Sequence, residues 1–270
     1  MKIRKSDGTL QAFNKTKLER ALDRARVCDD AKQEVMEQLP RMIRPGTSTQ
    51  QIHTRVLHML EQIDPVGAAR YNLKHSMFQL GHSGYPFEQY VAKLLEAYGW
   101  KTQVSKDLPG KCVQHEVDVY AEREDEIRAI EVKYRNRPSG RVDVKVALYV
   151  HARHQDLSAQ NKEVEGALFT NTQFTESARL YGECVGMKMK GWNYPKDDGI
   201  AKFIEQKHLY PITVFTRIPQ HVVRNLSRDG IILANQLCKL SSEEAKRYGL
   251  KSKHFQHLQA DSQKLCALNL

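Results

Sequence analysis

Residues 116–134 read EVDVYAEREDEIRAIEVKY, with an alternating apolar run on each side of a charged cluster. This alternation predicts two strands joined by a charged turn, because residues two apart lie on the same face of a strand. Three charged residues nevertheless stand inside the apolar runs, namely Asp118, Glu131 and Lys133. Either they face solvent on half-exposed strands, or they converge on a metal ion and a phosphodiester.

Strand parity places Glu131 and Lys133 on the same face of one predicted strand. Asp118 stands between Val117 and Val119, so we expect both valines to face the core on the side away from it. If the two strands are antiparallel neighbours, the two carboxylates and the ammonium meet. Carboxylate oxygens hold Mg²⁺ or Mn²⁺, which lowers the pKa of an attacking water, and a lysine can neutralise charge developing on a phosphate. Phosphodiester hydrolysis needs this set of groups.

The patterns of the remaining chain divide it into three segments. Residues 1–82 begin with a hairpin signal at SDG and continue with four amphipathic helical stretches, until GHSGYP breaks the pattern. Residues 83–195 alternate helices and extended runs, and residues 196–270 form short helices with breaks at RDGI and RYGL. We expect a mainly α N-terminal domain with a β-hairpin, a central α/β domain with a mixed sheet, and a small α-helical C-terminal domain.

The charge of the chain favours a polyanionic partner. Its net charge is +10, and the excess of lysine and arginine lies in the first and last segments. No apolar run approaches the roughly 20 residues that span a bilayer, and MKIRKSDG lacks the apolar stretch of a signal peptide. The five cysteines are scattered and never in C-x-x-C spacing, which argues against disulfides and structural zinc. We expect a cytoplasmic protein with no membrane partner.

An aspartate followed on the next strand by Glu-x-Lys resembles the motif of the PD-(D/E)xK nuclease superfamily. The helical stretch GYPFEQYVAKLLEAYGW looks like the first helix of the Mrr-type restriction endonuclease branch, and residues 166–193 are similar to its closing strand–helix–strand. The resemblance implies a Mg²⁺- or Mn²⁺-dependent endonuclease that hydrolyses double-stranded DNA. It implies metal ligands at Asp118 and Glu131, and the catalytic set Glu88, Asp118, Glu131 and Lys133.

The sequence departs from this family at two places. Val117 precedes the aspartate, where the name of the superfamily shows proline. Many Mrr-like proteins carry a glutamine in the helix after Glu-x-Lys, whereas RVDVKVALYV offers Asp143 and Lys145, so the role of that glutamine stays open.

Histidines offer an alternative metal site. His151, His154 and Asp156 can share one end of a helix, and His254 and His257 stand three residues apart. Two side chains at this spacing with no third ligand nearby are more often surface residues. We therefore favour the carboxylate site.

Three ordered blocks of the first segment resemble an ATP-cone, the nucleotide-binding regulatory module of ribonucleotide reductases and their repressors. The blocks read IRKSDGTLQAFNKTKLERAL, TSTQQIHTRVLHML and VGAARYNLKHSMFQL, and no P-loop motif occurs. The resemblance implies ATP or dATP as an allosteric ligand, with phosphate contacts from Lys5 and Lys17 and with Thr49 and His53 flanking the nucleotide. Ser6 stands where the family usually has arginine, which implies weaker triphosphate binding or a different nucleotide. A basic domain that only touches DNA is the alternative.

The last segment is basic and resembles a helix-hairpin-helix module, in which backbone amides and basic side chains hold DNA phosphates. RDGI and KRYGLK lack the paired glycines of a well-formed motif, so a helical cap or a dimerisation domain is an equal alternative. The candidate DNA contacts are Arg224, Arg228, Lys246, Lys251 and Lys253.

These features favour a metal-dependent DNA endonuclease regulated by ATP or dATP. Since no apparatus for nucleotide hydrolysis is visible, the nucleotide is expected to act by shifting conformation or homo-oligomeric state. One alternative is a nucleotide-responsive DNA-binding regulator with a catalytically inactive nuclease fold. An RNA-directed nuclease is a further alternative that the sequence does not separate from the first.

Overall fold

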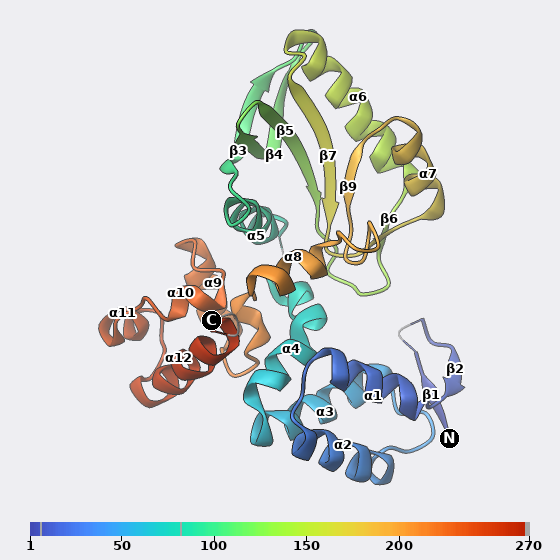
Figure 1. The fold of residues 1–270 in the computed structure, drawn as a ribbon, viewed down its shortest axis with the longest axis vertical. Coiled ribbons are helices and arrows are strands. Elements are labelled where there is room, and N and C mark those ends of the chain that lie inside the picture. The colour runs from blue at the N-terminus through green and yellow to red at the C-terminus, as the bar shows by residue number, and fades with distance from the viewer. Residues whose placement is uncertain (6, 82, 268–270) are drawn as a thin grey trace.

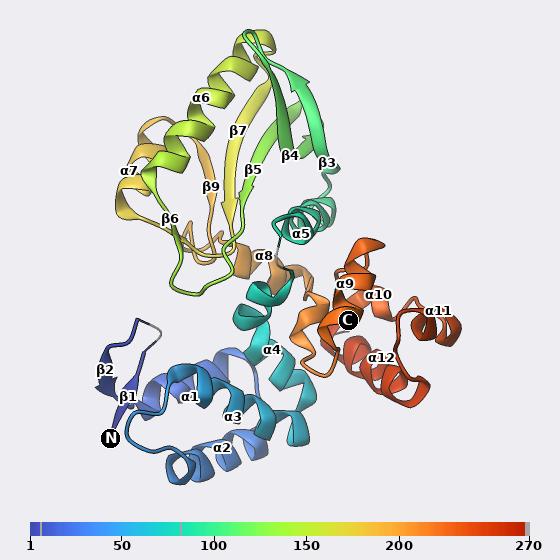
Figure 2. The same ribbon diagram turned by 180° about the vertical axis from the view of Figure 1, so that it is seen from behind.

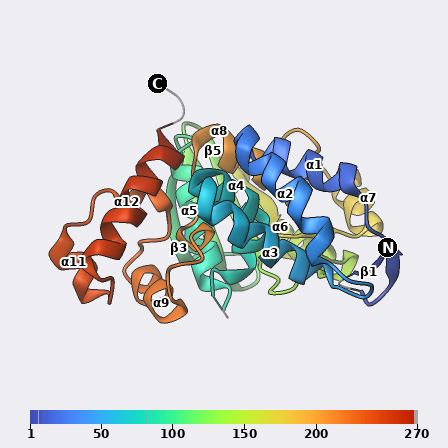
Figure 3. The same ribbon diagram turned by 90° about the horizontal axis from the view of Figure 1, so that it is seen from below.

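The computed structural model describes residues 1–5, 7–81 and 83–267. A β-sheet with its covering helices lies at one end of the molecule, and two groups of helices lie at the other (Figure 1). These two groups come from the N-terminal and C-terminal parts of the chain, and they lie on opposite sides of helix α4 (Figure 3).

The N-terminal group consists of a β-hairpin and helices. Its elements are β1 (Lys2–Arg4), β2 (Leu10–Ala12), α1 (Lys15–Arg24), α2 (Asp29–Met42), α3 (Thr49–Ile63), α4 (Pro65–Ser76) and the 3-10 helix η1 (Met77–Gln79). The side chain of Asn14 caps α1, and Ser48 forms a capping box at the start of α3. Apolar residues at helical spacing form one buried cluster with Ile3 of β1, and the cluster includes Leu22, Val35, Val56 and Leu60. The expected hairpin and helices are confirmed.

The central part is built around a mixed sheet. Among the described residues, five strands form it in the order β3 (Lys101–Pro109), β4 (Gln114–Arg123), β5 (Glu126–Lys133), β7 (Val164–Thr170) and β9 (Lys188–Lys190). The pairs β3–β4 and β4–β5 are antiparallel, whereas β5–β7 and β7–β9 are parallel. A short parallel pair, β6 (Arg141–Val142) and β8 (Gln173–Phe174), lies beside it. The expected α/β fold with a mixed sheet is confirmed.

Helices cover both faces of this sheet. Helix α5 (Tyr85–Glu96) packs on one face, where Phe87 joins Ile130 in one hydrophobic cluster. Helices α6 (Val144–Gln160) and α7 (Glu176–Cys184) cover the other face (Figure 2), where Leu157 packs with Ala129 and Val164. Ile130 and Ala129 are neighbours on β5, so strand parity sends one side chain to each face.

The C-terminal part is helical, as expected. Its elements are α8 (Ile200–Lys207), the 3-10 helix η2 (Ile212–Val214), α9 (Gln220–Arg228), α10 (Ala234–Leu237), α11 (Ser242–Arg247) and α12 (Ser252–Cys266). Gly230 follows α9 and Gly249 follows α11, with φ of 74° and 93°. Glycine adopts this left-handed backbone without steric cost, which explains why the breaks fall at RDGI and RYGL.

One hydrophobic cluster joins the C-terminal helices to both other parts of the molecule. It combines Leu73 of α4, Phe87 and Tyr90 of α5, and Val222 and Phe255 of the C-terminal helices. The expected boundaries at residues 82 and 195 remain a prediction. None of the described helices is long and apolar enough to cross a membrane.

Candidate active site

Asp118 lies where the pairing of β4 with β5 ends. The paired residues run from Arg123 and Glu126 to Val119 and Ile130. Beyond that point the Asp118 carboxylate accepts a hydrogen bond from the backbone N–H of Val132 at 2.7 Å. The Asp118 side chain therefore takes the place of a backbone acceptor for Val132, the residue between Glu131 and Lys133.

The backbone around Asp118 is irregular, and this corrects one expectation. Val119 belongs to the cluster under α5, whereas Val117 belongs to the cluster under α6, so the two valines do not share a face. On the neighbouring strand, Ser105 has φ of 53° between the pairs formed by Val104 and Lys106 with β4. Strand parity fails here because the pairing of β4 with β5 ends at Val119 and its pairing with β3 is interrupted at Asp118. A non-glycine residue at positive φ marks local strain, which is often found at functional sites.

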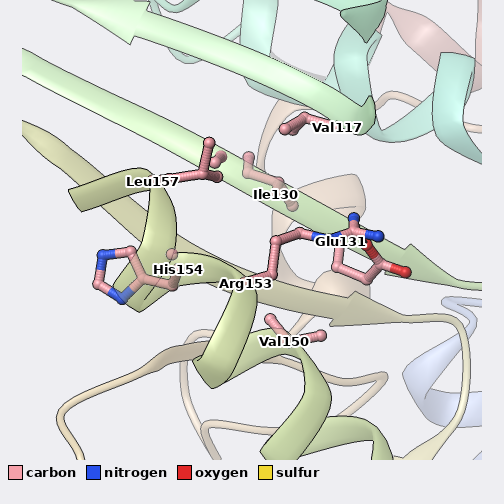
Figure 4. A pocket seen from close by; sticks show the side chains of 9 residues that line it. Val117, Ile130, Glu131, Val150, Arg153, His154 and Leu157 are labelled. Carbon is pink, nitrogen blue, oxygen red and sulfur yellow. Dashed lines mark hydrogen bonds and ion pairs between the residues drawn. The ribbon is translucent and has the colours of Figure 1, made fainter. Parts of the chain in front are cut away.

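Glu131 is almost fully buried, and two cationic side chains hold it. Its side chain is 4% exposed, and its Oε1 forms an ion pair with Lys133. Its Oε2 forms an ion pair with Arg153 of α6. Figure 4 shows Arg153 reaching from α6 toward Glu131. A buried carboxylate needs such partners, because removing a charge from water without compensation is very costly.

Glu88 lies in the first turn of α5, close to the same carboxylates. Burial raises its pKa to about 7, and the charges of Asp118, Glu116 and Glu131 contribute to that rise. Burial and the charge of Glu131 also raise the pKa of Asp118. The structure thus brings all four predicted catalytic residues into one electrostatic neighbourhood, together with Glu116.

The donors of this neighbourhood fit a hard divalent cation. Asp118 and Glu131 offer oxygen ligands from adjacent strands, and mutual repulsion between them is relieved when a cation binds. Within residues 1–5, 7–81 and 83–267, no group of three His, Cys, Asp or Glu side chains is arranged to hold a metal ion. Magnesium is commonly held by one or two carboxylates, with waters and phosphate oxygens completing its shell. Asp118 and Glu131 could supply two oxygen ligands to such a cation.

The first alternative metal site, His151 with His154 and Asp156, has its side chains engaged elsewhere. His151 Nδ1 lies 2.6 Å from the Tyr181 hydroxyl, and His154 Nε2 lies 2.8 Å from the carbonyl oxygen of Val164. The carboxylate of Asp156 binds His115 instead, at 2.8 Å. These three side chains do not meet.

The predicted nucleotide residues all lie in the N-terminal group. Lys5 is exposed in the hairpin, Lys17 lies in the first turn of α1, and Thr49 and His53 are one turn apart on α3. Ser6, the residue expected to weaken triphosphate binding, lies outside the described residues.

Helix α4 adds residues to this region that the sequence did not single out. The ring of His53 stacks on Tyr71, and its Nε2 lies 3.2 Å from the side-chain oxygen of Asn72. Burial and the nearby charges of Arg24 and Lys17 lower the pKa of Lys74. A separate open cavity of about 640 Å³ lies beside the start of α3, and none of the four predicted residues lines it. Its lining residues are Arg4, Gly46, Ser48, Gln50, Gln51, Thr54 and Arg55.

The candidate DNA contacts are exposed on the C-terminal helices. Arg224 and Arg228 lie on α9, Lys246 lies on α11, and Lys251 and Lys253 lie at the start of α12. Four of them stand within a few residues of the breaks at Gly230 and Gly249. Their role in DNA binding remains a prediction.

Comparison with known proteins identifies the class of the chain. Residues 80–192 match the restriction endonuclease family of the Mrr catalytic type, and residues 1–79 match the ATP cone domain. The chain belongs to this restriction endonuclease family and carries an ATP cone domain at its N-terminal side.

Several proteins are similar to parts of this chain. An uncharacterized protein of Archaeoglobus fulgidus is 37% identical over 175 residues, which cover 65% of this chain and 99% of the relative. A crystal structure of a protein of unknown function is 36% identical, with a TM-score of 0.59, and the match covers 68% of this chain and 99% of that one. A repair endonuclease from Pyrococcus abyssi is 19% identical with a TM-score of 0.33, over 41% of this chain and 47% of that one.

Proposed function

We propose that the protein is a metal-dependent DNA endonuclease whose activity responds to ATP or dATP bound by its cone domain. The observation that carries the proposal is the hydrogen bond from Val132 N–H to Asp118, because it holds one carboxylate beside the Glu131–Lys133 pair. The carboxylates of Asp118 and Glu131 and the ammonium of Lys133 would then lie beside one phosphate of a bound DNA substrate.

Each residue has a distinct task in this proposal. Asp118 and Glu131 would hold Mg²⁺ or Mn²⁺, which supplies Lewis acidity toward the phosphate and toward an attacking water. The Lys133 ammonium leaves Glu131 for the phosphate and stabilises the charge that develops there. Glu88, with a pKa raised to about 7, is poised to accept a proton from the attacking water near neutral pH.

Contacts between the parts of the molecule support regulation by the nucleotide. The Thr213 hydroxyl donates to the carbonyl oxygen of Ser76 at the end of α4, at 3.0 Å. The Tyr90 hydroxyl of α5 donates to the carbonyl oxygen of Leu209 at 2.7 Å. Residues 209–214 therefore touch both the last helix of the cone domain and the helix that carries Glu88. A change in the cone domain can reach Glu88 through this segment.

The proposal is tested with purified protein and supercoiled plasmid, methylated and unmethylated, in Mg²⁺ or Mn²⁺. We expect nicking or cleavage that stops with a chelator and changes in rate with ATP or dATP. Competing RNA separates a DNA substrate from an RNA substrate. Cleavage that persists in the chelator and in both Asp118→Ala and Lys133→Ala would overturn the proposal.

One observation favours the second function, a DNA-binding regulator with an inactive nuclease fold. Both oxygens of Glu131 are held by cationic side chains, which leaves Asp118 as the more available donor. That function predicts DNA affinity that depends on the metal, without cleavage of the DNA. The same plasmid assay shows whether cleavage occurs, and a binding measurement alongside it shows the affinity.

A further inference from the structure

Arg153 bridges the two strands of the candidate active site at the point where their backbone pairing ends. Its Nη1 donates to the carbonyl oxygen of Glu116 on β4 at 3.0 Å and also pairs with the carboxylate of Glu131 on β5. The regular pairing of these strands stops at Val119 and Ile130. The Arg153 guanidinium therefore connects β4 and β5 beside Asp118, where the two strands are no longer paired.

The guanidinium is itself held in place. Its Nη2 donates to the hydroxyl of Tyr149, one turn earlier on α6, and its carbon lies 4.8 Å from the centre of that ring. The Arg153 side chain is 17% exposed, and a cavity of only about 10 Å³ remains around it beneath α6. A planar guanidinium with several fixed partners keeps one orientation, and close packing leaves it little room to move.

The two oxygens of Glu131 are thus divided between two different cations. Lys133 binds Oε1, and its side chain is 31% exposed. Arg153 binds Oε2 from the buried side, under α6. A lysine ammonium on a flexible stem can leave its partner at small cost, whereas Arg153 would have to break several contacts at once.

We propose that Arg153 is a positioning residue for metal binding: it fixes Glu131 through Oε2, so that Oε1 is presented beside Asp118 when Lys133 moves to a phosphate. This inference rests on the proposed function and adds to it the residue that orders its donor pair. Ligating carboxylates are commonly oriented by such hydrogen-bonded neighbours, whose loss typically costs about 10- to 100-fold in metal affinity. In this account Arg153 stays in place when the metal binds.

Mn²⁺ binding to the full chain without DNA tests this inference. Electron paramagnetic resonance of the free ion measures how much Mn²⁺ is bound. We expect Arg153→Gln to weaken Mn²⁺ binding by about 10- to 100-fold. Arg153→Lys, which keeps the charge but cannot bridge both strands in the same way, is expected to fall in between. Arg128→Gln is the matched control, because Arg128 is an ion-paired arginine of β5 outside this cluster. The Mn²⁺ affinity of Arg128→Gln should equal that of the wild type.

Urea unfolding of each variant shows which variants are folded. If Arg153→Gln does not fold, Arg153→Lys provides the test of Mn²⁺ affinity. Unchanged Mn²⁺ affinity in a folded Arg153 variant would overturn the inference, and so would tighter binding, which would mean that Arg153 competes with the metal. Asp118→Asn separates this failure from that of the proposed function. If wild-type Mn²⁺ binding does not depend on Asp118, the proposed metal site fails and the role of Arg153 fails with it.

Discussion

The side-chain amide of Asn72 donates a hydrogen bond to the carbonyl oxygen of Val214 at 3.1 Å, across 142 positions of sequence. Its side-chain oxygen lies 3.2 Å from Nε2 of His53, and Asn72 is fully buried. One buried amide thus contacts both a predicted nucleotide residue and the segment that binds α5. Leaving a buried amide without a hydrogen-bond partner costs free energy. A change in the position of His53 is therefore expected to alter the hydrogen bond between Asn72 and Val214.

Replacing Asn72 is expected to uncouple cleavage from the nucleotide. Asn72→Ala leaves the Val214 carbonyl unpaired, so we expect the free energy of unfolding to fall by about 1–3 kcal/mol. The ratio of cleavage rates with and without ATP or dATP should move toward one. Rates and urea unfolding curves measured on the same preparation check both outcomes.

Asn171→Ala is the matched control for this experiment. Asn171 is also fully buried, and it bonds to the backbone of Arg135 in the α/β part of the molecule. It should lose similar stability while its nucleotide response stays intact. An undiminished nucleotide response in folded Asn72→Ala would show that the signal takes another route.

Glu88 is expected to make stability depend on pH. Burial and neighbouring carboxylates raise its pKa from 4.5 to about 7 in the folded protein. The folded state therefore holds this proton more tightly than the unfolded state does. The contribution to the free energy of unfolding is present below pH 4.5 and is lost as the pH rises to about 7.

Urea unfolding across this pH range measures the effect. Glu88→Gln should lose less stability than the wild type as the pH rises from 4.5 to 7, whereas Glu96→Gln, at the exposed end of α5, should follow the wild type. Parallel curves for the wild type and Glu88→Gln would mean that Glu88 ionises normally.

Tyr90 is expected to contribute one buried hydrogen bond between α5 and the C-terminal part. Tyr90→Phe removes the donor to Leu209, so we expect a loss of about 1 kcal/mol in the free energy of unfolding. Tyr85→Phe on the same helix is the control, since Tyr85 is 49% exposed. Equal stability of the two variants would contradict a bond between α5 and this segment.

The C-terminal lysines are expected to contact DNA phosphates. Each phosphate contact adds about 0.9 to the slope of log affinity against log salt concentration, so Lys251→Ala with Lys253→Ala should reduce the slope by about 2. Lys162→Ala with Lys188→Ala, two exposed lysines of the α/β part, is the control pair. If both pairs change the slope equally, the C-terminal helices are not the specific DNA contact.

Much of this architecture follows from the sequence because it depends on local periodicity. Helical spacing and strand alternation predict the elements, and parity with antiparallel pairing predicts that Asp118 approaches Glu131 and Lys133. The opposite faces of Val117 and Val119 were not predictable, since parity assumes regular pairing through Asp118. Arg153 and Asn72 were also missed. Arg153 contacts Glu116 and Glu131 on the strands, and Asn72 contacts Val214, so in each case these partners lie far away in sequence.

We propose that Asp118, Glu131 and Lys133 form one metal-dependent site for phosphodiester hydrolysis. Single-turnover cleavage of a labelled duplex in Mg²⁺ tests it most directly, with the wild type compared with Asp118→Asn and Lys133→Met. We expect chelator-sensitive cleavage by the wild type and a loss of about 100-fold or more in the cleavage rate of each variant, with folding retained. Cleavage at the wild-type rate by folded Asp118→Asn and Lys133→Met would contradict it.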